Sequence, residues 1–146
     1  MKALHQSNRP GVVGIIAAAV LSLAACSATP YGDRTNVALS GDQEVPAVKT
    51  AASGGGTITV NADKSVSGSV TTAGVSGTMA HIHLAPAGKN GPVIVPLAKS
   101  GDNTWSVPAG ATLTDAQYQA YKAGELYVNV HSAENKGGEI RGQLKP

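Results

Sequence analysis

The feature of this chain that most constrains its fold is a series of short runs in which polar and apolar residues alternate. Residues 57–60 and 65–70 alternate in this way on either side of a turn at 61–64, and residues 126–131 and 139–144 repeat the pattern near the C-terminus. Alternation with a period of two places the apolar side chains on one face of a β-strand. Many short strands of this kind predict a single all-β domain, built as a Greek-key β-sandwich.

One segment breaks the alternation and predicts a short helix at about residues 113–123. Thr114 and Gln117 have the spacing of a capping box, in which each side chain bonds the backbone N–H of the other residue. Gly124 then provides the residue that commonly ends a helix. The expected architecture is therefore a β-sandwich with one helical interruption.

The N-terminus has the pattern of a bacterial export signal. Lys2 and Arg9 supply positive charge ahead of an apolar run at residues 11–23. That run is too short to cross the ~30 Å hydrocarbon core of a bilayer as a helix, and its flanks are those of a secretory signal. It ends in Leu-Ala-Ala-Cys, which resembles the lipobox recognised by lipoprotein signal peptidase. The sequence therefore predicts a lipoprotein signal peptide at residues 1–25.

Cys26 is the only cysteine in the chain, and its place after the apolar run makes it the expected lipidation site. The alternative is an ordinary export signal that a cysteine follows by chance. By resemblance to bacterial lipoproteins, a diacylglycerol on the thiol and a further acyl chain such as palmitate on the amine would anchor the protein. Residues 26–36 are small and polar, which predicts a lipidated tether. Ser27, where aspartate often marks retention, favours the outer membrane and a domain that faces the periplasm of a Gram-negative cell.

Removal of the signal leaves 121 residues without net charge. The chain has 11 Lys+Arg and 9 Asp+Glu, and because Lys2 and Arg9 leave with the signal, nine of each remain. This balance offers no basic surface for nucleic acid. The expected partner is the membrane, reached through the lipid, and no protein partner is identified. With its one cysteine acylated the domain at residues 37–146 has no disulfide, and without Phe its core must consist mainly of Val, Ile, Leu and Ala.

A pair of histidines two residues apart is the strongest chemical feature of the domain. His81 and His83 fall in a predicted strand at residues 79–84, so both point to the same face with Cα atoms roughly 6.6 Å apart. Two imidazoles at this spacing can lean toward one copper or zinc ion at about 2.0–2.1 Å. Met79 shares the face, and a thioether near imidazoles favours copper.

His131 is the candidate for a third ligand. It shares one face of its predicted strand with Asn129, opposite the apolar residues. Glu139, in the facing strand, and Asn129 are the expected hydrogen-bond partners that orient a ligand histidine. The alternative is that the three histidines are structural, on the polar side of a sheet, and bind no metal.

Other groups of residues in the sequence do not indicate a catalytic or phosphate-binding site. Ser132, His131 and Asp102 could form a triad on paper, but no serine has the surroundings of a nucleophile elbow, so we expect a non-catalytic protein. The glycines at 54–56 lie outside any strand-to-helix turn and are interpreted as a flexible segment. Arg141 alternates outward on the last strand and is interpreted as a surface charge.

Four blocks in the second half of the chain, with a fifth near the start of the domain, resemble the CHRD domain, which is named after the extracellular protein chordin. These blocks are residues 39–46, 80–84, 91–97, 126–132 and 137–144, so the resemblance spans about 36–144. It implies an all-β, immunoglobulin-like domain without an established catalytic activity, one that also occurs alone in secreted bacterial proteins.

The resemblance extends to the histidines. The family's recurrent histidines match His81, His83 and His131, whereas Met79 is not part of that pattern, and Lys136 stands where the family usually has a proline. The paired strand histidines also resemble those of the copper–zinc superoxide dismutase sandwich, which uses more histidines than this domain has. The sequence therefore predicts a lipid-anchored envelope domain that binds copper or zinc, with a metal-free structural or protein-interaction module as the alternative.

Overall fold

The structure of the protein is a computed structural model that describes residues 32–146. The expected signal peptide at 1–25, the lipidation site Cys26 and most of the expected tether at 26–36 lie outside the described residues. Those three expectations therefore remain predictions.

The described chain is an all-β structure with one α-helix, as the sequence predicts. Its elements are β1 (Asp33–Ser40), the 3-10 helix η1 (Gly41–Gln43), β2 (Ser53–Val60), β3 (Val66–Ala73), β4 (Gly77–Leu84), β5 (Val93–Pro96), β6 (Ala98–Gly101), β7 (Thr104–Ser106), α1 (Asp115–Lys122), β8 (Leu126–Ser132) and β9 (Ile140–Leu144).

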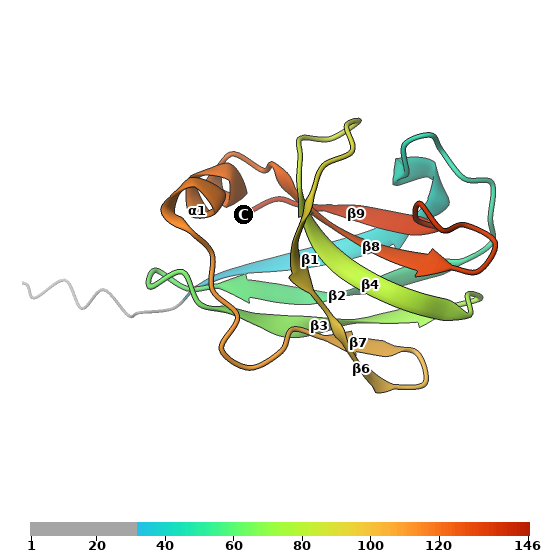
Figure 1. The fold of residues 1–146 in the computed structure, drawn as a ribbon, viewed down its shortest axis with the longest axis horizontal. Helices are drawn as coiled ribbons and strands as arrows, with labels where there is room; N and C mark the ends of the chain where they lie inside the picture. The colour runs from blue at the N-terminus through green and yellow to red at the C-terminus, as the bar shows by residue number, and fades with distance from the viewer. Residues whose placement is uncertain (1–31) are drawn as a thin grey trace, which may run out of the picture.

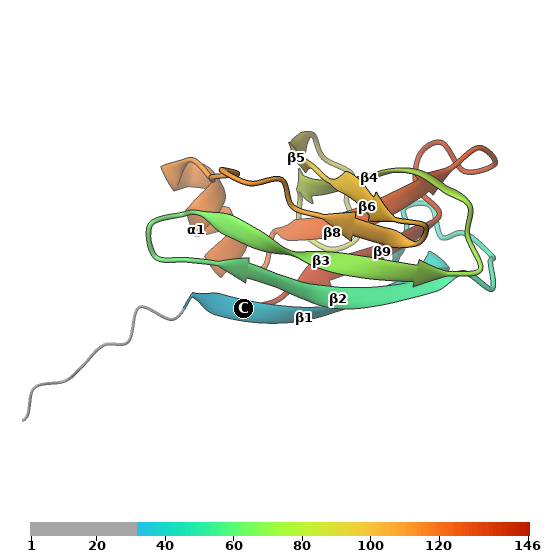
Figure 2. The same ribbon diagram turned by 90° about the horizontal axis from the view of Figure 1, so that it is seen from below.

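The strands form one nearly closed antiparallel sheet that folds into two layers. The strand order is β5-β4-β8-β9-β1-β2-β3-β7-β6. In this spatial order the first four strands, β5, β4, β8 and β9, form one layer. The other five, β1, β2, β3, β7 and β6, form the layer that packs against it, as the two views show (Figures 1 and 2). The layers join where β9 meets β1 through the single pair Ser40 and Arg141. The β-sandwich is thus confirmed, and the Greek-key order of its connections remains a prediction.

The core between the layers contains the apolar residues of the alternating strands. Ile58, Val70, Val128, Val130 and Ile140 have no exposed surface. In β3 the burial pattern follows the alternation of the sequence, whereas β8 is buried along its whole length because its outward-facing residues are also covered. This packing determines which residues of each strand face outward.

The glycines at 54–56 form part of β2 and are paired on both sides, so their interpretation as a flexible segment is wrong. They lie where neighbouring elements approach closely. A Cβ at Gly56 would clash with the backbone oxygen of Ser69, and one at Gly54 would crowd Leu39. The missing side chains therefore permit close packing of the second layer.

The helix lies within the predicted range and begins as its capping box indicates. Thr114 accepts from the backbone N–H of Gln117, whose side chain in turn accepts from the backbone N–H of Thr114. Tyr121 then connects α1 to β1: its hydroxyl donates to the carbonyl of Asp33 at 3.1 Å and accepts from Thr35 at 2.8 Å. This contact explains why β1 begins four residues before the expected start of the domain at 37.

Helix length bears on membrane insertion. Across residues 32–146, no helix is both long enough and apolar enough to span a bilayer.

Replacement of Tyr121 by Phe should destabilise the domain. The side chain is fully buried, and loss of its hydroxyl leaves the buried Thr35 hydroxyl and the Asp33 carbonyl without this partner. We expect the free energy of unfolding to fall by about 1–2 kcal/mol, measured by urea denaturation. Tyr118→Phe, on the same helix and partly buried, is the control and should change stability by less than about 0.5 kcal/mol. Equal effects of the two substitutions would contradict the proposed role of the Tyr121 hydroxyl.

Candidate metal centre

The three histidines of the domain meet on the outer face of the β4–β8 ladder. In this ladder Met79 pairs with His131, His81 with Asn129, and His83 with Tyr127. The alternate residues of both strands point into the core, so these six side chains share the opposite face. The pairing of β4 with β8 therefore brings His131 next to His81 and His83.

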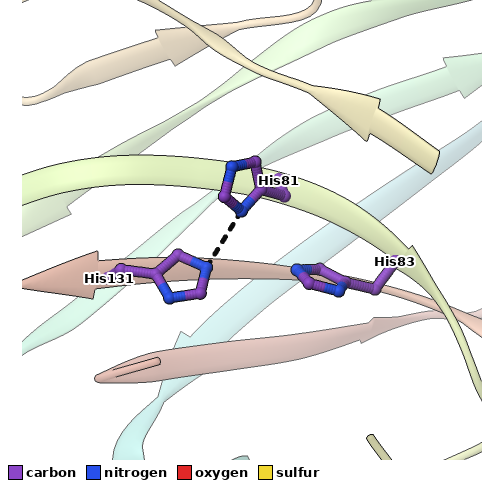
Figure 3. A group of neighbouring side chains, drawn as sticks. All are labelled: His81, His83 and His131. Atoms are coloured by element: carbon purple, nitrogen blue, oxygen red, sulfur yellow. Dashed lines mark hydrogen bonds between the residues drawn. The ribbon is translucent and has the colours of Figure 1, made fainter. Parts of the chain in front are cut away.

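The three imidazole rings converge on one point (Figure 3). His81 Nδ1 lies 3.0 Å from His131 Nε2. One ring nitrogen from each of His81, His83 and His131 can be chosen so that all three lie within 4.8 Å of one another. Two nitrogens bound to the same ion at about 2.1 Å are at most about 4.2 Å apart. The three nitrogens could therefore hold an ion once the rings move closer together and the hydrogen bond between His81 and His131 opens.

Backbone carbonyls determine the tautomers of two of these rings. His83 Nδ1 lies 2.9 Å from the carbonyl oxygen of Gly91, and His131 Nδ1 lies 2.9 Å from that of Lys136. A carbonyl oxygen can only accept, so each Nδ1 carries the hydrogen and each Nε2 keeps a lone pair. This is the arrangement that orients metal-binding histidines in proteins.

His83 Nε2 provides the test of whether these residues fit a metal. The atom is buried and has no hydrogen-bond partner among the described residues. A buried acceptor without a partner is unfavourable in a protein, whereas a lone pair directed at an ion is satisfied. The nitrogen set therefore fits a transition-metal ion.

The electrostatics of the centre also suit metal binding. Burial lowers the pKa of His81, and the neighbouring His131 and His83 lower it further. Burial likewise lowers the pKa of His83, although its bond to the Gly91 carbonyl acts in the opposite direction. A lowered pKa keeps an imidazole neutral, which is the form that binds a metal.

A stack of three side chains supports His83 from one side. The rings of His83 and Tyr127 are nearly parallel, with centroids 4.8 Å apart. The guanidinium of Arg141 lies 3.4 Å from the centroid of the Tyr127 ring. Arg141 also donates to the carbonyl of Lys89 at 2.8 Å, which ties the loop between β4 and β5 to the sheet.

The interpretation of Arg141 as a surface charge is wrong. Its side chain is only 1% exposed. The alternation in β9 correctly places it on the face away from the core, but the loop between β4 and β5 covers that face. Alternation indicates the face of a sheet and does not reveal what packs over it.

Glu44 is a buried group near the centre that the sequence reading missed. Its carboxylate accepts from the side-chain amide of Asn129 at 3.4 Å. Desolvation raises the pKa of Glu44, while the bond from Asn129 and the charge of Arg141 partly oppose that change. Glu44 lies in one of the family-like blocks, and that location is the only sequence signal that could have identified it.

The sequence also indicates Met79, Asn129 and Glu139 as candidate site residues, and the structure places each of them differently. Met79 lies beside the centre with its side chain half exposed. Asn129 is buried next to the histidines. The Glu139 carboxylate accepts from Thr50 at 2.8 Å, while the Nδ1 atoms of His83 and His131 bond backbone carbonyls. Metal binding by Met79 and an orienting role for Glu139 therefore remain predictions.

The arrangement does not support a catalytic triad of Ser132, His131 and Asp102. The Nδ1 atom of His131, which a triad carboxylate would need, is bonded to the carbonyl of Lys136. Asp102 is exposed in the turn between β6 and β7. What the described residues bring together is a group of three imidazoles that could hold a metal ion.

Comparison with known proteins gives one match. The model of the CHRD domain matches residues 35–144, which agrees with the extent expected from the sequence blocks. No curated protein and no solved structure matches the chain significantly. The family match covers most of the chain and contains all three histidines of the centre, and on this basis the chain belongs to the CHRD domain family.

Proposed function

We propose that this CHRD domain binds one copper or zinc ion through His81, His83 and His131, and that it does so as a non-catalytic protein of the cell envelope. The observation that carries the proposal is the buried Nε2 of His83, which has no protein partner in the described chain and belongs to a group of three converging imidazoles. Two of the three tautomers are already set by backbone carbonyls, so little ordering remains to be done on binding.

The donor set supports copper and zinc over harder ions. Imidazole nitrogen suits both metals, and magnesium, calcium and manganese prefer oxygen ligands. Met79, half exposed beside His131, offers a soft sulfur that copper would use. In this proposal the ion lies on the outer face of the sheet, beside the partly exposed His81 and the half-exposed Met79.

The proposed location follows from the N-terminal residues. The apolar run and the cysteine at its end support export and acylation at Cys26. Anchoring through several acyl chains would keep the domain at the outer membrane on its periplasmic side. There the protein would take up or hold metal ions close to the membrane.

A structural role is the second candidate, and one observation favours it. His83 and His131 each bond a loop that crosses the edge of the site, through Gly91 and Lys136. His83 also stacks on Tyr127. In this case the histidines would hold loops in place within a metal-free envelope or protein-interaction module.

Metal analysis of the purified protein separates the two candidates. We expect about one equivalent of copper or zinc per chain, and none after His81→Ala with His83→Ala, since three nitrogens are needed to hold the ion. Metal at 100 times its dissociation constant should raise the free energy of unfolding by about 2.7 kcal/mol. Ser67→Ala, at an exposed position of β3, is the control and should bind metal like the parent protein. A parent protein that stays metal-free in titrations, with a double variant that only loses stability, would establish the structural role.

Acid should release the metal in a defined range. Because the folded protein holds the pKa of His81 and His83 below that of free histidine, both remain neutral at pH values somewhat below about 6.5. The affinity should therefore be nearly constant above about pH 7 and decrease as the pH falls below the lowered pKa values, by about tenfold per pH unit for each proton taken up. Competition titrations with a chelator across this range measure the effect. An affinity that is unchanged down to pH 4 would argue against histidine ligation.

Substitution of Cys26 by Ser tests the anchoring. Without a thiol no diacylglycerol can be attached, so the protein should move from the membrane fraction to the soluble periplasmic fraction. Metabolic labelling with palmitate should mark the parent protein and leave the variant unlabelled. Ser27→Ala, at the adjacent position, should stay labelled and membrane-bound. A variant that remains fully membrane-bound would contradict the lipoprotein assignment.

A further inference from the structure

We infer that the side-chain oxygen of Asn129 is the fourth donor of the metal centre, and that the centre therefore selects a divalent ion, Zn²⁺ or Cu²⁺, over Cu⁺. The inference rests on the proposed function and specifies its ligand set. Asn129 was expected from the sequence only to orient a histidine by hydrogen bonding.

The strand register places Asn129 below the middle of the three histidines. His81 is its direct cross-strand partner, His131 is two residues further along the same face of β8, and His83 is its diagonal neighbour on β4. Direct partners on one face of an antiparallel pair have Cβ atoms about 5 Å apart, and diagonal neighbours lie about 7–8 Å apart. An ion held by all three imidazoles therefore lies over the Asn129 position.

The orientation of the Asn129 amide is determined by its other contacts. Its Nδ2 atom donates to the carbonyl oxygen of Gly137 at 3.3 Å and to the carboxylate of Glu44 at 3.4 Å. Both partners accept, so the amide nitrogen must face them. The oxygen Oδ1 consequently points away from Gly137 and Glu44.

Two buried polar atoms at this place have no hydrogen-bond partner in the described part of the chain. They are Asn129 Oδ1 and His83 Nε2, the lone-pair nitrogen of the centre. Asn129 is 2% exposed, so water has little access to its oxygen. A buried lone-pair atom without a partner is unfavourable, and a cation within reach of both atoms would satisfy both.

Glu44 strengthens the amide oxygen as a donor. Its buried carboxylate accepts from the Asn129 N–H, which polarises the amide and places more negative charge on Oδ1. The carboxylate also contributes negative charge near a centre made otherwise of neutral ligands. Such partners of a metal ligand typically change affinity by about 10–100-fold.

The position of Met79 indicates a lesser role for sulfur. Met79 pairs with His131 at the edge of the group and is 49% exposed, while Asn129 lies below its middle. A thioether favours Cu⁺ because it is soft, and an amide oxygen is hard and favours a divalent ion. With oxygen as the fourth donor, three nitrogens and one oxygen give the tetrahedral set that suits zinc.

The test compares Asn129→Leu with Met79→Leu in the purified full-length protein. Leu has nearly the shape of Asn and lacks both the oxygen and the amide N–H groups that Glu44 and Gly137 accept from. We expect the dissociation constant for Zn²⁺ to rise about 10–100-fold in Asn129→Leu, with Met79→Leu within about threefold of the parent protein. The dissociation constant for Cu⁺ should change less than that for Zn²⁺ in Asn129→Leu. Thermal denaturation of the metal-free variants shows whether each is folded.

Measurements on the parent protein test the inference even if Asn129→Leu does not fold. X-ray absorption of the zinc-loaded protein should show only light atoms at about 2.0–2.2 Å and no sulfur at about 2.3 Å. The ¹³C resonance of the Asn129 side-chain carbonyl should shift on zinc binding, while that of Asn103 on the β6–β7 turn should not. An unshifted Asn129 carbonyl, a sulfur scatterer, or an unchanged zinc affinity in Asn129→Leu would overturn the inference. If His83→Ala still binds zinc fully, the proposed three-histidine site itself is wrong.

Discussion

The rest of the structure depends on the antiparallel pairing of β4 with β8, whose register is held by buried aliphatic side chains. Ala80 and Ile82 on β4, and Val128 and Val130 on β8, face the core and are almost fully buried. A shift of one residue would move these side chains to the outer face and place histidines in the core. The apolar packing therefore indirectly determines which polar residues meet on the outer face.

That outer face differs from the solvated side of an ordinary two-layer sandwich. Loops cover it, and they are bound to the sheet by polar side chains such as Arg141, Gln143 and Asn129. A covered polar layer is favourable only where its groups are paired. In the described residues most are paired, and the exceptions near the histidines are His83 Nε2 and Asn129 Oδ1. The two buried atoms near the histidines that lack a hydrogen-bond partner are thus also the atoms that the proposed metal ion would contact.

The fold was largely predictable because its signals are local. The hairpin of β2 and β3 and the final strands β8 and β9 follow from period-two alternation, and the helix follows from the capping box at Thr114. The errors concern contacts between segments that are distant in sequence. The glycines at 54–56 belong to a strand because other strands approach them closely, and Arg141 is buried because a distant loop covers it.

For the site, strand periodicity alone already places His81 and His83 on one face, since residues two apart in a strand point the same way. The sequence also determined the all-β class and the position of the helix. Three features came from the folded chain: His131 lies within reach of both, backbone carbonyls of Gly91 and Lys136 set two tautomers, and Asn129 pairs with His81 across the ladder. The physical reason is that strand periodicity is a property of neighbouring residues, whereas the pairing of β4 with β8 joins segments some fifty residues apart and depends on the packing of the whole core.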